Sequence, residues 1–247
     1  AGLKLNEMIA NGTIKENEAK MGYVGAFTYA EVISGYTSFY LGAKSVCPSV
    51  TMDVQFTGSW YDLTAEKTSA EALIERGCKL ISQHADSMGA PSACEQAGVP
   101  NVSYNGSTFE ACPDTFIVSS RIDWTPYFKY IITQNAQGLA IDDNWTGTLA
   151  TGSVVLTNLG GKATAAGTVE KIVEVRKQLA DGTLHVFDTS KFTYKGQHIS
   201  SFLADLDGDY VGETEVCFDG IIKESFLRSA PYFDLKIDGI TLLNEKI

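Results

Sequence analysis

The sequence predicts an α/β fold built around a largely parallel sheet. From Met21 onward, short apolar runs of strand type alternate with segments of helical periodicity, and this unit recurs five times before residue 123. Such alternation is the sequence signature of βαβ units. The 247 residues are 44% hydrophobic and 20% charged, which is typical of a packed globular protein. A chain of this length can form one large domain or two smaller ones.

The predicted helices follow the strands in register. Residues 31–46 carry apolar side chains at helical spacing, with Gly35 and Gly42 placed to allow close approach to the sheet. Another helix runs from about Thr64 to a stop at Gly77. Thr125 and Pro126 fit the N-cap and first position of a further helix. The predicted strands are 21–27, 51–58, 79–84, 101–106 and 116–122.

The second half of the chain is less regular. A Thr- and Gly-rich stretch at 144–161 precedes a helix around 169–179, and β-like segments follow to the end. The tail DLKIDGITLLN is expected to form a hairpin about Asp238 and Gly239. Residues 205–216 resemble a calcium loop, but Tyr210 and Val216 stand where glycine and glutamate are required, so an acidic hairpin turn is expected instead.

Composition and motifs exclude several function classes. Nineteen basic against thirty acidic residues give a net charge of −11, which disfavours nucleic-acid binding. The longest uncharged stretch is too polar for a membrane span, and the first residues show no signal peptide. The common hydrolase, zinc and phosphate-binding motifs are absent, and the five cysteines lack metal-ligand spacing. We therefore expect no catalysis, metal or cofactor.

The residues that follow the predicted strands are more informative. In open α/β sheets, ligands bind beyond the carboxyl ends of the strands. At those positions this sequence repeatedly offers an aromatic ring together with a hydrogen-bonding group. Such a rim suits a flat, polar small molecule such as a nucleoside. At any one position, and above all at Tyr29 and Tyr61, the side chain could equally cap the sheet. The candidate ligand-binding residues are Phe27, Trp60, His84, Asp86, Asn105, Asp123 and Trp124.

Several motifs together resemble a known family. They are GYVGAFTYAEVISGYTSFYLGAKSVCP, SWYDLTAEKTSAEALIERG, ISQHADS and IDWTPYF. In this order they are similar to the basic membrane lipoprotein family, whose members are surface-anchored substrate-binding components of ABC importers. Characterised members bind purine nucleosides. The resemblance covers residues 1–184 and weakens toward the end of the chain.

The resemblance implies a type I periplasmic-binding-protein fold, with two Rossmann-like lobes that close on a ligand. Residues 20–120 and 150–247 correspond to the second lobe. Residues 1–19 and 125–140 correspond to hinge and helices that belong with the first lobe, most of which we expect to lie outside this chain. The implied protein works at the outer face of the cell membrane, lipid-anchored, or in the periplasm, and passes its ligand to an ABC permease.

The resemblance also assigns roles to the candidate residues. Trp60 falls where the family places an aromatic side chain facing the cleft, and His84 and Asp86 match its strand-end Q-H-x-D-S motif. Many relatives have aspartate in place of Asn105, and the nucleoside-binding branch commonly has a lysine near Asp123 that this chain lacks. A free purine base or another polar ligand is therefore also open. The alternatives are a nucleoside-processing enzyme and a ligand-sensing regulatory domain.

Overall fold

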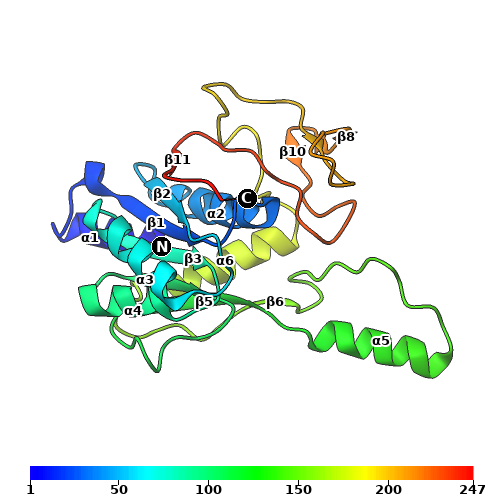
Figure 1. The fold of residues 1–247 in the computed structure, drawn as a ribbon, viewed down its shortest axis with the longest axis horizontal. Coiled ribbons are helices and arrows are strands. Elements are labelled where there is room, and N and C mark those ends of the chain that lie inside the picture. The colour runs from blue at the N-terminus through cyan, green and yellow to red at the C-terminus, as the bar shows by residue number, and fades with distance from the viewer. Residues whose placement is uncertain (247) are drawn as a thin grey trace.

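A seven-stranded sheet forms the centre of the computed structural model, which describes residues 1–246 (Figure 1). Its strand order is β11-β2-β1-β3-β4-β5-β6. All neighbours are parallel except β6, which runs antiparallel to β5. The strands are β1 (Lys20–Gly25), β2 (Thr51–Phe56), β3 (Leu80–His84), β4 (Asn101–Tyr104), β5 (Phe116–Ile122), β6 (Val154–Leu156) and β11 (Ile240–Leu242). The α/β fold with a parallel-dominated sheet is therefore confirmed.

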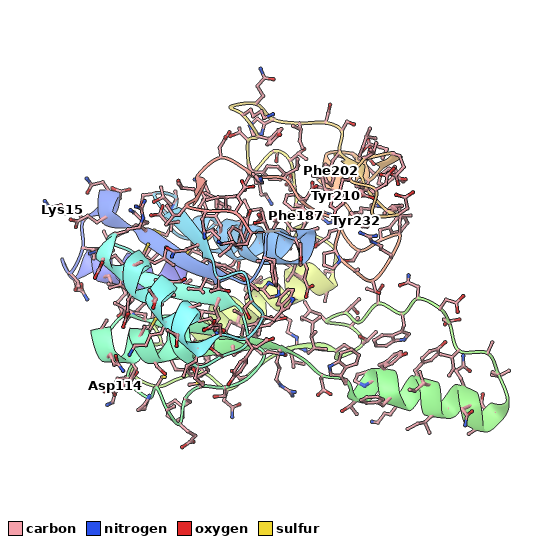
Figure 2. The ribbon with its side chains drawn as sticks, viewed as in Figure 1. Lys15, Asp114, Phe187, Phe202, Tyr210 and Tyr232 are labelled. Carbon is pink, nitrogen blue, oxygen red and sulfur yellow. The ribbon has the colours of Figure 1, made fainter. Side chains whose placement is uncertain are left out.

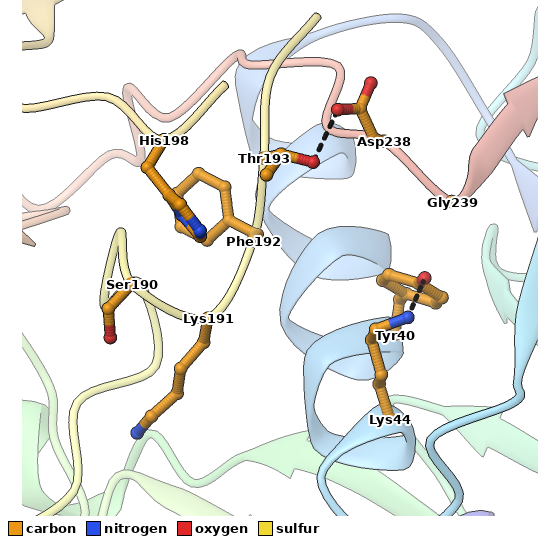
Figure 3. A pocket seen from close by; sticks show the side chains of 9 residues that line it. All are labelled: Tyr40, Lys44, Ser190, Lys191, Phe192, Thr193, His198, Asp238 and Gly239. Carbon is orange, nitrogen blue, oxygen red and sulfur yellow. Dashed lines mark hydrogen bonds between the residues drawn. The ribbon is translucent and has the colours of Figure 1, made fainter. Parts of the chain in front are cut away.

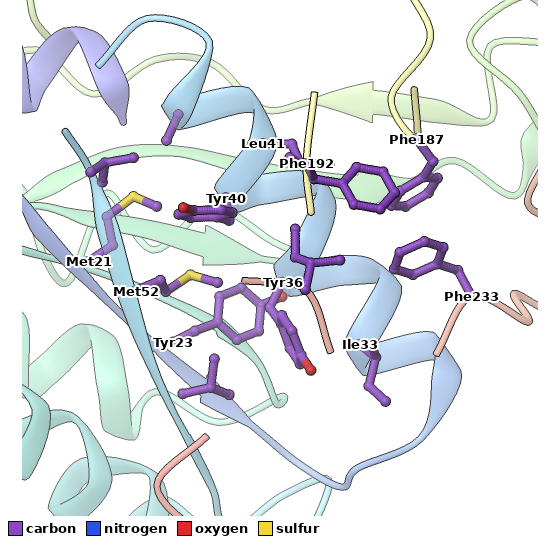
Figure 4. Packing of buried hydrophobic residues seen from close by; sticks show 14 of the residues in the cluster. Met21, Tyr23, Ile33, Tyr36, Tyr40, Leu41, Met52, Phe187, Phe192 and Phe233 are labelled. Carbon is purple, nitrogen blue, oxygen red and sulfur yellow. The ribbon is translucent and has the colours of Figure 1, made fainter. Parts of the chain in front are cut away.

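Helices cover both faces of this sheet, which is why β1 is buried at every residue after Lys20. On one face, α3 and α4 pack over Val24 and Ile81. On the other, α2 packs over Tyr23, Met21 and Met52, with Tyr36 and Tyr40 fully buried between (Figure 4). The helices are α1 (Gly2–Ala10), α2 (Ala30–Lys44), α3 (Leu63–Glu75), α4 (Gly89–Ala97), α5 (Thr125–Gln137) and α6 (Thr168–Ala180).

One glycine prediction in α2 is right and the other is wrong. A Cβ on Gly35 would lie 2.7 Å from Nδ1 of His84, so this glycine lets a β3 side chain pack against the helix. No atom lies within 4 Å of the corresponding position at Gly42, which therefore serves no close approach. Only the residue nearer the carboxyl ends of the strands brings helix and sheet together.

The C-terminal region docks on the sheet through aromatic side chains. Phe187 and Phe233 stack with ring centroids 4.1 Å apart, and Phe192 and Phe202 pack against Phe233 (Figures 2 and 4). Two small antiparallel ladders lie in this region, and one of them is the hairpin of residues 203–215 that the acidic turn predicts. The ladders join β7 (Leu203–Ala204) to β8 (Thr214–Glu215) and β9 (Cys217–Phe218) to β10 (Ile221–Ile222).

The predicted hairpin at Asp238 and Gly239 is wrong. Residues 240–242 form β11, which extends the sheet by pairing parallel with β2. Asp238 instead accepts hydrogen bonds from the Thr193 hydroxyl and the Gly196 amide. A turn sequence of the Asp-Gly type is a local signal, whereas the apolar edge of β2 offers a partner from a distant part of the chain.

Helix α5 stands apart from the rest of the molecule (Figure 1). None of its residues is buried, and Phe128 and Ile132 are more than half exposed. Its N-cap is Trp124 rather than the predicted Thr125, and the Asp123 carboxylate accepts the Thr125 amide at 2.9 Å. By contrast, α1 packs on α2 and contributes the fully buried Leu5 to the core. The assignment of both helices to a first lobe stays a prediction.

Candidate functional site

The strand order places a topological switch point between β1 and β3. From β1 the chain first adds β2 on one side and then continues with β3 on the other. The loops that follow β1 and β3 therefore diverge, and the crevice between them is the usual ligand position in such sheets. Phe27 lies beyond the end of β1, and His84 is the last residue of β3.

Aromatic side chains gather at this crevice. The Phe27 and Tyr29 rings stack with centroids 5.0 Å apart, and Trp60 lies 5.7 Å from Phe27 and 6.4 Å from Tyr29. Trp60 in turn meets His84 edge to face at 6.1 Å. Trp60 is half-buried, whereas the neighbouring Tyr61 is 69% exposed. The two adjacent aromatics therefore occupy different environments.

His84 lies beneath this cluster with its ring buried. The side chain is 6% exposed, and neither ring nitrogen has a hydrogen-bond partner among residues 1–246. Glu31 Oε1 lies 3.7 Å from Nε2, which is ion-pair distance if the imidazole is protonated. Interaction with His84 lowers the pKa of Glu31. A histidine with two free nitrogens at a crevice is equipped to bind a donor or an acceptor on a small molecule.

Two residues at the crevice were not predicted from the sequence. Tyr104 packs on His84 at 4.4 Å between ring centroids, and Glu31 Oε1 lies 3.7 Å from Nε2 of His84. Tyr104 is the last residue of β4, whereas the candidates were chosen from the positions that follow each strand. Glu31 lies in the first turn of α2, where an acid is expected for its interaction with the helix dipole. No sequence signal marks it as part of a site.

Asp86 joins the same region through the backbone. Its amide donates to the Trp60 carbonyl at 2.8 Å, which ties the loop after β3 to the loop after β2, and its side chain is exposed. Asp62 plays a structural part, since its carboxylate accepts the amides of Thr64 and Ala65 and caps α3. The structure thus brings together Phe27, Trp60, His84 and Asp86.

The remaining candidates lie farther along the sheet. Asn105 is exposed beyond β4 and has a left-handed backbone, with φ at 64°. Asp123 accepts hydrogen bonds from Thr125, and these lower its pKa. Trp124 is 55% exposed and packs against Tyr127 and Phe128 of α5 rather than against Trp60. These three residues share the sheet edge but are not part of the aromatic cluster.

Two cavities flank α2. One of about 850 Å³ lies over the sheet between α2 and α6 and reaches His84 and Tyr104, with mainly apolar walls. The other, of about 280 Å³, lies at the Lys44 end of α2, where Tyr40, Lys44 and His198 line it (Figure 3). Because the strand-end crevice lies at the Glu31 end of α2, the smaller cavity is separate from the candidate site.

The acidic hairpin of residues 203–215 is a folded turn. The carboxylates of the acidic hairpin come within 4.8 Å of one another, and Asp205 accepts the amides of Gly208 and Tyr210, as expected of a folded acidic turn. All five cysteines are buried thiols in the described part of the chain. Among residues 1–246, no helix combines the length and apolar character needed to cross a bilayer.

Comparison with known proteins decides the family. The sequence profile of the ABC transporter substrate-binding protein PnrA-like family, Bmp, matches residues 12–184, which is most of the chain. The chain belongs to this family. Bmp proteins are non-catalytic substrate-binding components, so the nucleoside-processing enzyme is no longer a candidate.

The names of individual relatives of this Bmp chain mention different ligands. A putative ABC transporter glucose-binding protein, TsgA13, of Haloferax volcanii is 30% identical over 81% of this chain and 52% of its own length. A purine-binding protein of Brucella abortus is 35% identical over 43% of this chain and 31% of its own. Metabotropic glutamate receptor-like protein J of Dictyostelium discoideum is 31% identical over 51% of this chain and 16% of its own. The chain spans about half, or less, of these relatives.

A solved structure supports the fold. The solute-binding protein of an ABC transporter system from Aeropyrum pernix matches with a TM-score of 0.61 at 15% identity, over 80% of this chain and 63% of that one. At this identity the likeness concerns the fold alone. The type I periplasmic-binding-protein fold that the sequence resemblance implies is thus confirmed for this Bmp chain.

Proposed function

We propose that this chain is the second lobe of an extracytoplasmic receptor that binds a purine nucleoside or purine base and delivers it to an ABC permease. Capture occurs by closure of two lobes around the ligand, with no chemistry performed on it. The observation that carries the proposal is the aromatic cluster at the switch point, where Phe27 and Trp60 lie above the buried His84.

The geometry of the cluster fits a flat heterocycle. An aromatic ring gains from stacking on a base without depending on its hydrogen-bond pattern. Below the rings, His84 offers two ring nitrogens without hydrogen-bond partners in the part of the chain that the structure describes, and the Glu31 carboxylate can accept hydrogen bonds from amine or hydroxyl groups. Asn105 and Asp123, farther along the same edge, would contact the ribose or the opposite lobe.

The lobe assignment is part of the same proposal. In the proposed assembly, residues 20–120 and 150–247 belong to the second lobe. Residues 125–140 carry exposed apolar side chains that need a partner surface. Packing of α5 on a first lobe would bury Phe128 and Ile132 and would place the second wall of the cleft opposite Trp60. We place the assembled protein at the outer face of the membrane, lipid-anchored or periplasmic.

A thermal-shift screen of the full-length protein tests this function. Adenosine, inosine, guanosine, adenine and hypoxanthine form the purine panel, and glucose is included because a relative carries it in its name. A ligand at 100 times its dissociation constant stabilises the fold by about 2.7 kcal/mol. Stabilisation by a purine compound and not by glucose supports the proposal, whereas the reverse result replaces it with a sugar receptor.

A second candidate is the ligand-sensing domain of a membrane receptor. It is favoured by the similarity to the Dictyostelium receptor-like protein, in which the matched region is a small part of a much longer chain. Immunoblotting of the native protein separates the two. A receptor polypeptide of that kind would be about twice as long as a two-lobed binding protein and would remain in the membrane fraction after lipid-anchor cleavage.

A further inference from the structure

Glu66 is a buried acid that the proposed ligand contacts do not use. It lies in the first turns of α3, its side chain is 0% exposed, and burial raises the pKa of its carboxyl. Burying an acid is costly unless hydrogen bonds compensate for the lost hydration. The groups that face this carboxylate explain why it is tolerated.

The Glu66 carboxylate accepts backbone amides from two separate loops. Oε1 accepts the Asp62 amide at 3.2 Å and the Ser87 amide at 3.1 Å, and Oε2 lies 3.2 Å from the same Ser87 nitrogen. Asp62 ends the loop that carries Trp60, and Ser87 directly follows Asp86. One side chain therefore holds both loops that supply candidate ligand contacts.

Close packing around Glu66 leaves these loops little room to move. A Cβ on Gly89, the first residue of α4, would lie 2.4 Å from the Leu63 carbonyl and 2.9 Å from Cβ of Glu66. The start of α4 thus rests directly on the start of α3, and the Asp86 amide adds its bond to the Trp60 carbonyl. The two loops and the two helix starts behave as one unit with the carboxylate at its centre.

We infer that Glu66 is a positioning residue of the binding site, which fixes the Trp60 ring and the Asp86 carboxylate relative to each other before ligand arrives. Hydrogen bonds to an ionised acceptor are stronger than neutral ones. A preorganised site loses less conformational freedom on binding and so binds more tightly. The inference rests on the proposed function, because the loops matter only if they hold ligand.

The test replaces Glu66 with its near-isostere. Glu66→Gln keeps one acceptor oxygen but turns an amide NH2 toward the backbone N–H groups. In the full-length protein, we expect the affinity for adenosine or hypoxanthine, whichever stabilises the wild type, to fall at least tenfold. We also expect faster hydrogen exchange at the Asp62 and Ser87 amides without ligand. Glu71→Gln on the half-exposed side of α3 is the matched control and should change neither.

The outcomes separate positioning from a merely structural role. A lower melting temperature with unchanged affinity, or unchanged exchange at the two amides, overturns the inference. If no purine compound binds the wild type, the proposed function fails first, and the inference, which depends on it, falls as well. Should the glutamine variant not fold, Glu66→Asp carries the same two measurements, since it keeps the charge but withdraws the oxygens from the loops. Wild-type affinity in that variant also counts against the inference.

Discussion

Replacing Trp60 by alanine tests the aromatic cluster most directly. The ring is half-buried, 5.7 Å from Phe27 and 6.1 Å from His84, and in the proposed function it stacks on the planar ligand. Stacking of a base on an aromatic side chain contributes about 1–3 kcal/mol. At about 1.4 kcal/mol per tenfold, loss of that contact weakens binding by roughly 5- to 150-fold.

The same substitution has a separate effect on the free energy of unfolding. Trp60 packs edgewise or tilted against its aromatic neighbours, and such pairs contribute about 0.5–1.5 kcal/mol each. Unfolding must therefore be measured alongside binding. Isothermal calorimetry of Trp60→Ala in the full-length protein, at a temperature where the variant is folded, reports the loss of affinity. Trp60→Phe, which retains a ring, should recover part of it.

Tyr61→Ala is the control, because its ring is 69% exposed and only its backbone amide, which bonds to Ser59, is fixed. This variant should bind almost as tightly as the wild type. Equal affinities for Trp60→Ala and Tyr61→Ala would refute the assignment of Trp60 to the ligand site. The aromatic cluster would then be a cap on the sheet.

Two further predictions concern stability. Asp62→Ala removes the side chain that accepts the amides of Thr64 and Ala65, so urea unfolding should show a loss of about 1 kcal/mol that Asp62→Asn, which keeps an acceptor oxygen, largely avoids. Burial raises the pKa of the Glu224 carboxyl above its ordinary value of 4.5. Glu224 therefore loses its proton at lower pH in the unfolded chain than in the folded chain. The free energy of unfolding of the wild type consequently falls as the pH rises from 4.5 through the raised pKa. Glu224→Gln, which can still accept the Ser34 hydroxyl, should show a smaller loss over that window in melting curves; an identical pH dependence would contradict the burial argument.

Much of the fold was predictable because its signals are local. The first five strands lie where short strand-type runs predict them, and the helix predicted from about Thr64 to Gly77 is α3, Leu63–Glu75. The sequence misled where a distant partner decided the structure. The Asp238-Gly239 pair has the local signature of a hairpin, yet the chain pairs parallel with β2, whose residues lie far away in the sequence.

The candidate site shows the same division. Phe27, Trp60 and His84 were predictable as neighbours, because carboxyl ends of adjacent parallel strands meet at one edge. Tyr104 and Glu31 were not, since one closes a strand and the other opens a helix, positions that packing and dipole effects already explain. Whether these two residues belong to the site depends on how their side chains are oriented toward His84. Sequence periodicity alone does not give that orientation.

The parallel addition of β11 has a consequence for engineering this protein. The chain leaving β11 returns to the loop after β1, where the Thr28 amide donates to the Lys246 carbonyl at 2.8 Å and the Thr28 hydroxyl accepts the Lys246 amide at 2.9 Å. Thr28 lies between the stacked rings of Phe27 and Tyr29 in sequence. Lys246 therefore lies beside the loop that carries the stacked rings, so a small fluorophore attached at position 246 is placed to register ligand capture in the proposed site.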